Sequence, residues 1–161
     1  NVAIDARDIN SIDRRGIAFS LSGSGTVEYN IAAYQRSGTG NVAAFNMESF
    51  NSGLLRGNAV YDWQSPIEPG QGVALQWSGG SGSVTCDGNK LFMPNTGMLV
   101  RHESRNYSSE FVYRSNTYFT TTPPQGISGY LPFVRASGQG LDWSDWRSLA
   151  GESGSTYMSS A

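Results

Sequence analysis

The chain has 161 residues, a formal charge of −2, 20 glycines and a single lysine. This length fits one domain with a sizeable core, and the near balance of 11 basic and 13 acidic side chains excludes the basic footprint that nucleic-acid binding needs. The single cysteine excludes an internal disulfide. The sequence contains no run of about twenty apolar residues, so no membrane-spanning helix is predicted.

Residues 1–15 differ in character from the rest of the chain, because charged side chains surround the isoleucines Ile9 and Ile12. The segment is predicted to be either the end of a fibrous stalk or an extended arm lying against the domain or a neighbour. Both alternatives place a boundary at residue 15 and assign residues 16–161 to a head domain.

Short runs of alternating apolar and small polar residues begin after Gly16. Ile17–Leu21 and Val27–Ala33 flank the turn Gly23-Ser24-Gly25 and predict a hairpin. A second hairpin turn is expected at Asp87-Gly88-Asn89, whose residues accept positive φ. Further strands are expected at residues 41–47, 59–63, 73–77, 83–86, 90–93, 98–102, 109–114 and 116–122.

This series of short strands, separated by glycine turns and without a long helical pattern, predicts an all-β fold. The expected architecture is an antiparallel β-sandwich of the jelly-roll type, with an up-and-down barrel as the alternative. The turn Pro69-Gly70 before residues 73–77 is common where jelly-roll strands begin, including in trimeric heads that resemble tumour necrosis factor. No internal repeat of about 20 to 50 residues stands out, which argues against a solenoid or propeller.

Three single residues carry separate expectations. Cys86 is predicted to be a small buried residue of a strand. Trp77, in phase with Val73 and Leu75, is predicted to lie in the core. His102, between Arg101 and Glu103, is predicted to be a solvated polar residue rather than a catalytic base.

No residue pattern in the sequence supports a catalytic site, a metal site or a cofactor site. One histidine and one cysteine are too few for a zinc site, and Asp142 with Asp145 is a weak candidate for calcium because no acidic loop surrounds it. Carboxylates that could serve a glycosidase are present, but no spacing selects a pair; they are Asp62, Glu68, Glu103, Glu110, Asp142 and Asp145.

Sugar binding has better support, because saccharide rings stack on aromatic faces while acidic and amide groups accept hydroxyl hydrogens. Candidate ligand-binding residues fall in three stretches: Asp62 with Trp63, Arg105 with Tyr107, and the group Asp142, Trp143, Asp145, Trp146 and Arg147. Arg101, Arg105 and Arg147 could instead clamp an acidic group. For Trp63, Trp143 and Trp146, a place in the core or in a subunit interface is an equal alternative.

The last quarter of the chain resembles the knob-type repeats of bacteriophage and pyocin tail fibres. The resemblance rests on Pro124-x-Gly126-x-x-Gly129-Tyr130, a Gly/Ser turn, and Trp143-Ser144-x-Trp146-Arg147-x-Leu149. It implies a trimeric attachment device on a virion tail or phage-like particle, joined to other tail components through its N-terminus and acting outside the host cell.

The sequence therefore favours a non-enzymatic tail-fibre or needle tip that binds a host surface glycan or protein receptor as a homotrimer. The second hypothesis is a carbohydrate-binding module or lectin domain of a larger secreted protein. A structural capsid or assembly domain, without any glycan site, is the third.

Overall fold

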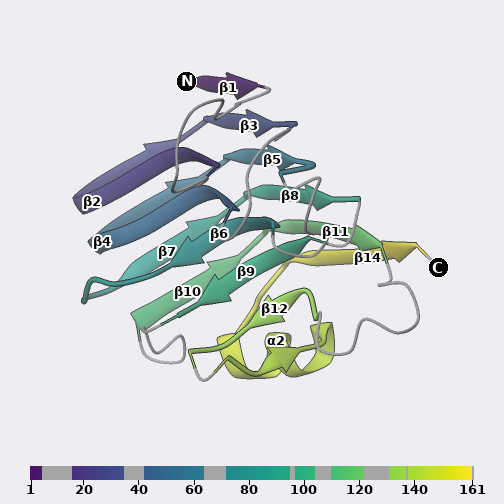
Figure 1. The fold of residues 1–161 in the computed structure, drawn as a ribbon. Helices are drawn as coiled ribbons and strands as arrows, with labels where there is room; N and C mark the ends of the chain where they lie inside the picture. The colour runs from purple at the N-terminus through teal and green to yellow at the C-terminus, as the bar shows by residue number, and fades with distance from the viewer. Residues whose placement is uncertain are drawn as a thin grey trace.

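The structure is a computed structural model. It describes residues 1–4, 16–34, 42–63, 72–94, 97–103, 110–121, 131–136 and 138–160. The chain winds into a parallel β-solenoid, in which each coil lays its strands against those of the coil before it (Figure 1). The predicted antiparallel sandwich is therefore wrong: among the described strands, only β12 and β13 pair antiparallel.

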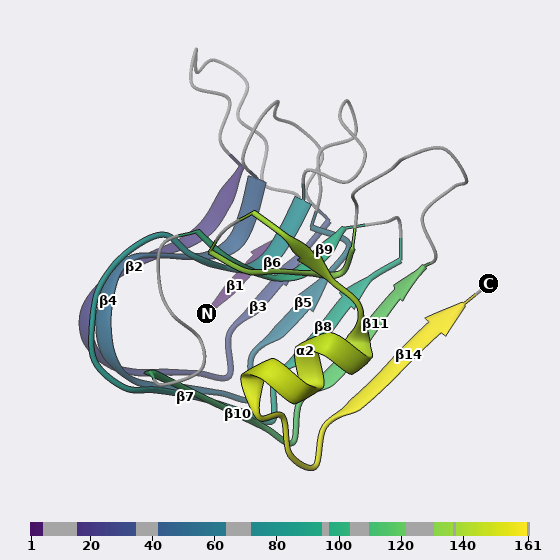
Figure 2. The same ribbon diagram turned by 90° about the horizontal axis from the view of Figure 1, so that it is seen from below.

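Sheet A forms one side of the solenoid, with six strands in the order β1-β3-β5-β8-β11-β14. These strands are β1 (Val2–Ile4), β3 (Ile31–Ala33), β5 (Ala59–Tyr61), β8 (Lys90–Met93), β11 (Thr117–Thr121) and β14 (Thr156–Ser160). Figure 2 shows them following one another along one side of the molecule.

Sheet B wraps around the other side, where the long strands β2 and β4 bend (Figure 2). Its members are β2 (Ile17–Glu28), β4 (Val42–Arg56), β6 (Gly72–Trp77), β7 (Val84–Asp87), β9 (Met98–His102), β10 (Phe111–Arg114), β12 (Phe133–Val134) and β13 (Gly140–Leu141). The first half of β4 pairs with β6 and its second half pairs with β7. One strand of an early coil thus corresponds to two strands of a later one.

The predicted hairpins are also wrong. Gly23-Ser24-Gly25 lies inside β2, at a place where the register to β4 shifts. Asp87-Gly88-Asn89 does change the direction of the chain, but it connects β7 of sheet B with β8 of sheet A. Each alternating run pairs with the equivalent run one coil away, because in a parallel sheet the neighbours are distant in sequence.

The core consists of inward-facing side chains in rows that cross the coils. One row on sheet A is Ala32, Val60, Leu91 and Tyr118. On sheet B, Phe45, Leu75, Val100 and Phe133 form another row. Trp77 and Cys86 are fully buried, as predicted. The prediction that His102 is solvated is wrong: the residue occupies the inward position beside Trp77, is buried, and its Nε2 lies 2.8 Å from the Tyr113 hydroxyl.

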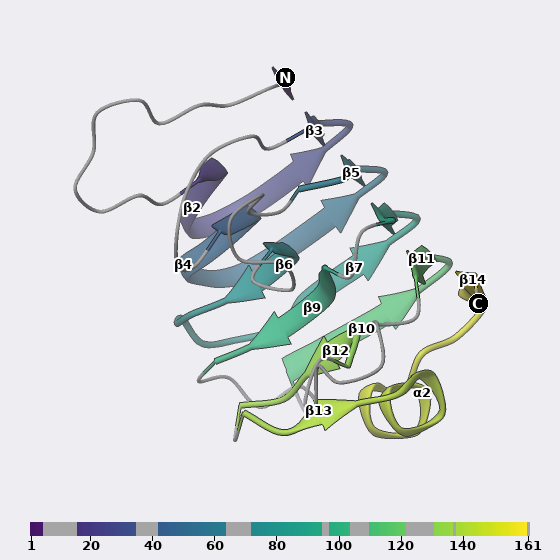
Figure 3. The same cartoon turned by 45° about the vertical axis from the view of Figure 1, so that its right-hand side comes forward.

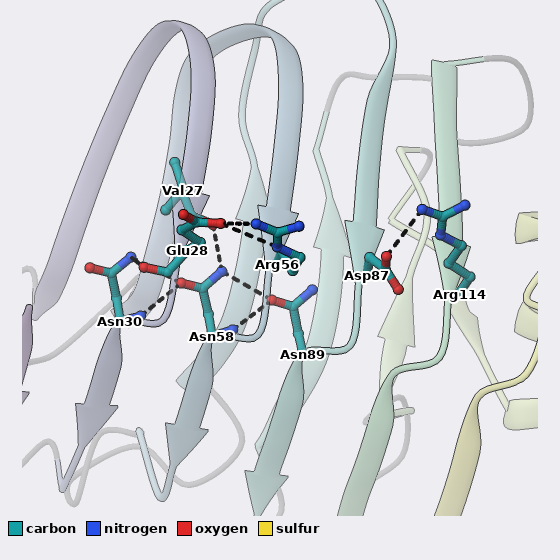
Figure 4. A network of polar contacts seen from close by, with 8 residues as sticks. All are labelled: Val27, Glu28, Asn30, Arg56, Asn58, Asp87, Asn89 and Arg114. Carbon is teal, nitrogen blue, oxygen red and sulfur yellow. Dashed lines mark hydrogen bonds and ion pairs between the residues drawn. The ribbon is translucent and has the colours of Figure 1, made fainter.

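A ladder of buried asparagines fixes the turn between the two sheets (Figure 4). Asn30 donates its backbone N–H to the Oδ1 of Asn58 at 3.1 Å, Asn58 to that of Asn89 at 3.0 Å, and Asn89 to that of Asn116 at 2.9 Å. The ladder ends at Ser155, whose Oγ accepts the backbone N–H of Asn116 at 2.9 Å. Each turn thus satisfies a buried backbone donor of the previous one.

The residue before each ladder position adopts a left-handed backbone: Tyr29, Gly57, Gly88, Ser115 and Gly154 have φ between 54° and 64°. This shared unit is an internal repeat, so the sequence-based expectation of no repeat is wrong. The repeat is hard to see because successive asparagines are 28, 31 and 27 residues apart. Moreover, tyrosine and serine occupy a conformation that usually indicates glycine.

A row of alternating charges runs beside the ladder, two residues before each asparagine (Figure 4). Register places Glu28 beside Arg56, Arg56 beside Asp87, and Asp87 beside Arg114. Glu28 forms an ion pair with Arg56, and Asp87 with Arg114 at 3.1 Å. Like charges directly opposite in a sheet are destabilising, so the alternation supports this register.

The C-terminal segment covers the end of the core (Figure 3). β12 pairs with β9, β13 returns beside β12, and helix α2 (Trp143–Ala150) follows. The helix begins at Asp142, whose Oδ1 accepts the backbone N–H of Asp145 at 2.9 Å, and ends at Gly151 with φ 62°. A solenoid leaves its last coil open, and a terminal element with a polar outer side closes it.

β1 already belongs to the solenoid, since it pairs with β3 in sheet A. The proposed stalk or arm of residues 1–15 otherwise falls on residues 5–15, which lie outside the described residues. Within the described part of the chain, no helix has the length and apolar character needed to cross a membrane.

Candidate functional site

Five of the predicted ligand-binding residues belong to the C-terminal cap. Trp146 is fully buried and stacks on Phe133, with ring centroids 4.8 Å apart. Trp143 is partly buried and stacks on Tyr157 at 5.4 Å. Asp142 caps the helix, while Asp145 and Arg147 are exposed on it. The pattern that carried the resemblance to tail-fibre knobs therefore serves here to close the core.

The cap contains a buried carboxylate, Glu152, which accepts hydrogen bonds from the Tyr118 hydroxyl, from Trp146 Nε1 at 3.2 Å and from Ser155 Oγ at 2.5 Å. Burial raises the pKa of Glu152, although its hydrogen bonds oppose that effect. Burial, followed by the charge of Glu152, raises the pKa of Tyr118 well above its usual value. The cluster joins the cap to the end of the asparagine ladder.

The other predicted residues lie elsewhere. Trp63 follows β5, is fully buried and donates its Nε1 hydrogen to the carbonyl of Gly16 at 3.0 Å. Asp62 is also buried and has a left-handed backbone, with φ 51°. Arg105 and Tyr107 fall outside the described residues. The structure thus does not bring the two tryptophan stretches together, and it leaves the faces of Trp63 and Trp146 inaccessible to a ligand.

A polar pocket lies instead on the outward side of sheet B. Its volume is about 210 Å³, and its lining comes from β2, β4, β6 and the segments that follow β6 and β9. The lining residues are Ile17, Ala43, Asn46, Glu48, Gln76, Ser78 and Glu103.

Strand alternation and parallel pairing create this pocket. Phe45 and Met47 face the core, so Asn46 between them faces outward, and the same holds for Gln76 between Leu75 and Trp77. Register places Asn46 directly beside Gln76. Two amides from residues 30 positions apart therefore become neighbours on the outer surface.

A short chain of hydrogen bonds orients the amides. Gln76 Nε2 donates to Ser78 Oγ at 3.1 Å, and Ser78 Oγ donates to Asn46 Oδ1 at 3.0 Å. This arrangement fixes the Gln76 amide so that its other atom, Oε1, remains as an acceptor. Gln76 is only 5% exposed, and its buried Oε1 has no hydrogen-bond partner among the described residues.

A buried acceptor without a donor is costly, by about 1–3 kcal/mol. Native proteins satisfy nearly all such groups, and exceptions call for an explanation such as a bound water, ion or ligand. An N–H or O–H donor from outside the chain, on a water or a ligand, is therefore expected at Gln76 Oε1.

Two carboxylates complete the lining. Glu103 forms an ion pair with Arg101 at 3.2 Å, and Arg101 lies beside Gln76 in the sheet. Glu48 is exposed and has no ion-pair partner within the described part of the chain. The pocket thus presents an amide oxygen and two carboxylates, of which one is balanced by an arginine.

Sequence reasoning missed Asn46, Glu48, Gln76 and Ser78. It named Glu103 only among several carboxylates from which no glycosidase pair could be selected. One signal was present: Asn46 and Gln76 are single amides within the apolar runs at residues 43–47 and 73–77. An amide at the centre of such a run indicates a polar position on the face opposite the core.

The outer face of sheet A has a different character. Register aligns a mostly apolar row across its six strands, hereafter the apolar row: Ile4, Ala33, Tyr61, Phe92, Phe119 and Met158. Ile4, Tyr61 and Met158 are more than 40% exposed. Phe92 and Phe119 stack on each other, with ring centroids 6.1 Å apart.

Within the described residues, no group of three or more histidine, cysteine, aspartate and glutamate side chains is arranged to hold a metal ion. Comparison with protein-family models, curated proteins and solved structures found no match to this chain. A functional assignment therefore depends on the geometry of the pocket and the surrounding surfaces.

Proposed function

We propose that this chain is a non-enzymatic attachment domain that binds a cell-surface glycan through the polar pocket on sheet B. The observation that supports the proposal is the unpartnered Oε1 of Gln76, held by the Ser78–Asn46 hydrogen bonds at the wall of a pocket rich in acceptors. Saccharides supply several hydroxyl donors at close spacing, which is what these acceptors require.

The virion setting and the trimer remain part of this proposal. They rest on the resemblance of the last quarter of the chain to tail-fibre knobs, and the apolar row offers a surface on which copies could meet. Three linked pockets would turn a weak single-site affinity into useful avidity. A carbohydrate-binding module of a larger secreted protein is the alternative, and it would use the same pocket as a monomer.

The test is binding of the purified chain to an array of bacterial surface polysaccharides. We expect Gln76→Leu to weaken binding at least tenfold, about 1.4 kcal/mol. Gln139→Leu, the same change at an exposed residue that does not line the pocket, should leave binding unchanged. Urea unfolding of both variants separates loss of binding from loss of folding.

Equal binding by Gln76→Leu and the unmodified protein would exclude this pocket. Absence of binding to every polysaccharide would contradict the proposed function itself. Bound glycans recovered and weighed by mass spectrometry should be uncut, and shortened products would contradict the non-enzymatic assignment.

A further inference from the structure

Several functional groups around the pocket are hydrogen-bond acceptors. Gln76 donates one of the two Nε2 hydrogens to Ser78, and the Ser78 hydroxyl donates its hydrogen to Asn46. What remains toward a ligand includes Gln76 Oε1 and the carboxylates of Glu48 and Glu103. A neutral sugar hydroxyl offers one hydrogen, whereas a protonated amine offers three.

The charge of the pocket also favours a protonated amine over a neutral hydroxyl. The pocket and its immediate neighbour Arg101 contain two carboxylates and one guanidinium, and the guanidinium is paired with Glu103. Glu48 therefore leaves a local excess of negative charge. Hydrogen bonds between a cationic donor and a carboxylate are about twice as strong as neutral ones.

Size limits the ligand further. Pockets for drug-sized ligands have volumes of roughly 300–1,000 Å³, and this one has about 210 Å³. Such a volume suits one sugar ring or one substituent rather than a stretch of polysaccharide.

We propose that the pocket recognises a sugar carrying a free, protonated amino group, with the ammonium bound by Glu48 and the Oε1 of Gln76. This inference rests on the proposed glycan-binding function and specifies its ligand class. Glu103, which is paired with Arg101, also lines the pocket and accepts a hydrogen bond from a hydroxyl of the same ring.

The test uses three β-1,4-linked trisaccharides that differ only at carbon 2: those of glucosamine, N-acetylglucosamine and glucose. Calorimetry at about pH 6, where a free amine is protonated, should show the glucosamine trimer binding at least tenfold more tightly than the other two. Glu48→Gln should abolish this preference. Asp145→Asn, which removes one carboxylate from exposed helix α2, should preserve it and so exclude a general effect of net charge.

If the glucosamine trimer fails to bind, or binds no more tightly than the other two, the amine inference is wrong. The proposed function would still stand if any polysaccharide on the array bound in a Gln76-dependent manner. Trilysine serves as a separate arm: equal binding by this peptide would show that the pocket recognises an ammonium group without a sugar, and would overturn the assignment to an amino sugar.

Discussion

The side-chain oxygen of Asn89 accepts two hydrogen bonds from Asn58, one from its backbone N–H and one from its side-chain amide, both at 3.0 Å. Asn58 in turn accepts the backbone N–H of Asn30 and donates to the carbonyl of Val27 at 2.9 Å. Asn58 thus joins three consecutive coils, and its side chain is fully buried.

Asn58→Ala should therefore lower the free energy of unfolding by about 3 kcal/mol, because it leaves a buried backbone donor and a carbonyl without partners. Urea unfolding followed by circular dichroism measures this change. Asn51→Ala, in the same strand β4, provides the control: its side chain accepts an exposed hydrogen bond from Ser81, and its loss should cost less than about 1 kcal/mol. Equal costs would show that the ladder does not stabilise the coils.

The close approach of β2 and β4 gives a second prediction. A Cβ at Gly53 would lie 1.9 Å from the carbonyl oxygen of Gly25, whereas a Cβ at Gly88 would meet no atom within 4 Å. We expect Gly88→Ala to cost about 1–2 kcal/mol, the penalty of a left-handed alanine. Gly53→Ala should cost more than about 3 kcal/mol, because backbone must move.

Thermal and urea unfolding of the two glycine variants compare these costs directly. A Gly53→Ala protein as stable as Gly88→Ala would mean that the two strands are farther apart than the structure shows.

Glu152 predicts a pH dependence of stability. Its pKa is raised in the folded state, so the folded state binds a proton more readily than the unfolded state does. The resulting stabilisation is complete below the unfolded pKa, about 4.3, and is lost as the pH rises through the folded pKa. Relative to Glu152→Gln, the unmodified protein should lose stability as the pH rises above the unfolded pKa of about 4.3.

Urea unfolding of both proteins across this pH range tests the assignment. Because the glutamine side chain is isosteric with a protonated glutamic acid, the variant provides a reference that does not titrate at this position. Parallel stability curves would show that Glu152 does not titrate differently on folding.

Self-association through the apolar row is the fourth prediction. Light scattering at two concentrations should give three times the chain mass of 17.3 kDa, in accordance with the proposed trimer. Tyr61→Glu, at the exposed centre of the row, should shift the protein to monomer because it buries a charge in an apolar contact. Thr85→Glu, on β7 of sheet B, is the matched control and should keep the trimer.

A monomer at both concentrations would contradict the trimer and favour the carbohydrate-binding-module alternative. The proposed glycan site would be unaffected by that outcome, since the lining of the pocket comes from one chain.

The sequence predicted most of the short strands but not their partners, and the single strand predicted at Val27–Ala33 is instead the end of β2, a turn and β3, which lie in different sheets. Residues 90–93 and 98–102 were expected as strands, and they are β8 and β9. Alternation reveals which side of a strand is buried, but it is the same whether the neighbouring strand is the next one in sequence or one coil away. The repeated asparagine could have revealed the coil, but its variable spacing concealed it.

The candidate site was even harder to predict from the sequence. The spacing of Trp143 and Trp146 suits an exposed platform as well as a helix that closes a core, and only the position of Phe133 and Tyr157 distinguishes these cases. The pocket depends on the pairing of Asn46 with Gln76, which is a property of the register between two coils. No local pattern in either strand contains that information.

The turn built from a left-handed residue and an asparagine occurs in four successive coils, and the hydrogen bonds of the ladder join each of these turns to the turns beside it. A tandem duplication of one coil, for example residues 58–88, would therefore supply its own ladder position, but it would place two copies of Asp87 side by side in the row of charges. It would lengthen the molecule by one strand spacing, about 4.8 Å, without disturbing the cap. Because β6 lies between β4 and β9, such an insertion would also place one more strand between Asn46 and Glu103, so the number of coils and the shape of the pocket are coupled in this domain.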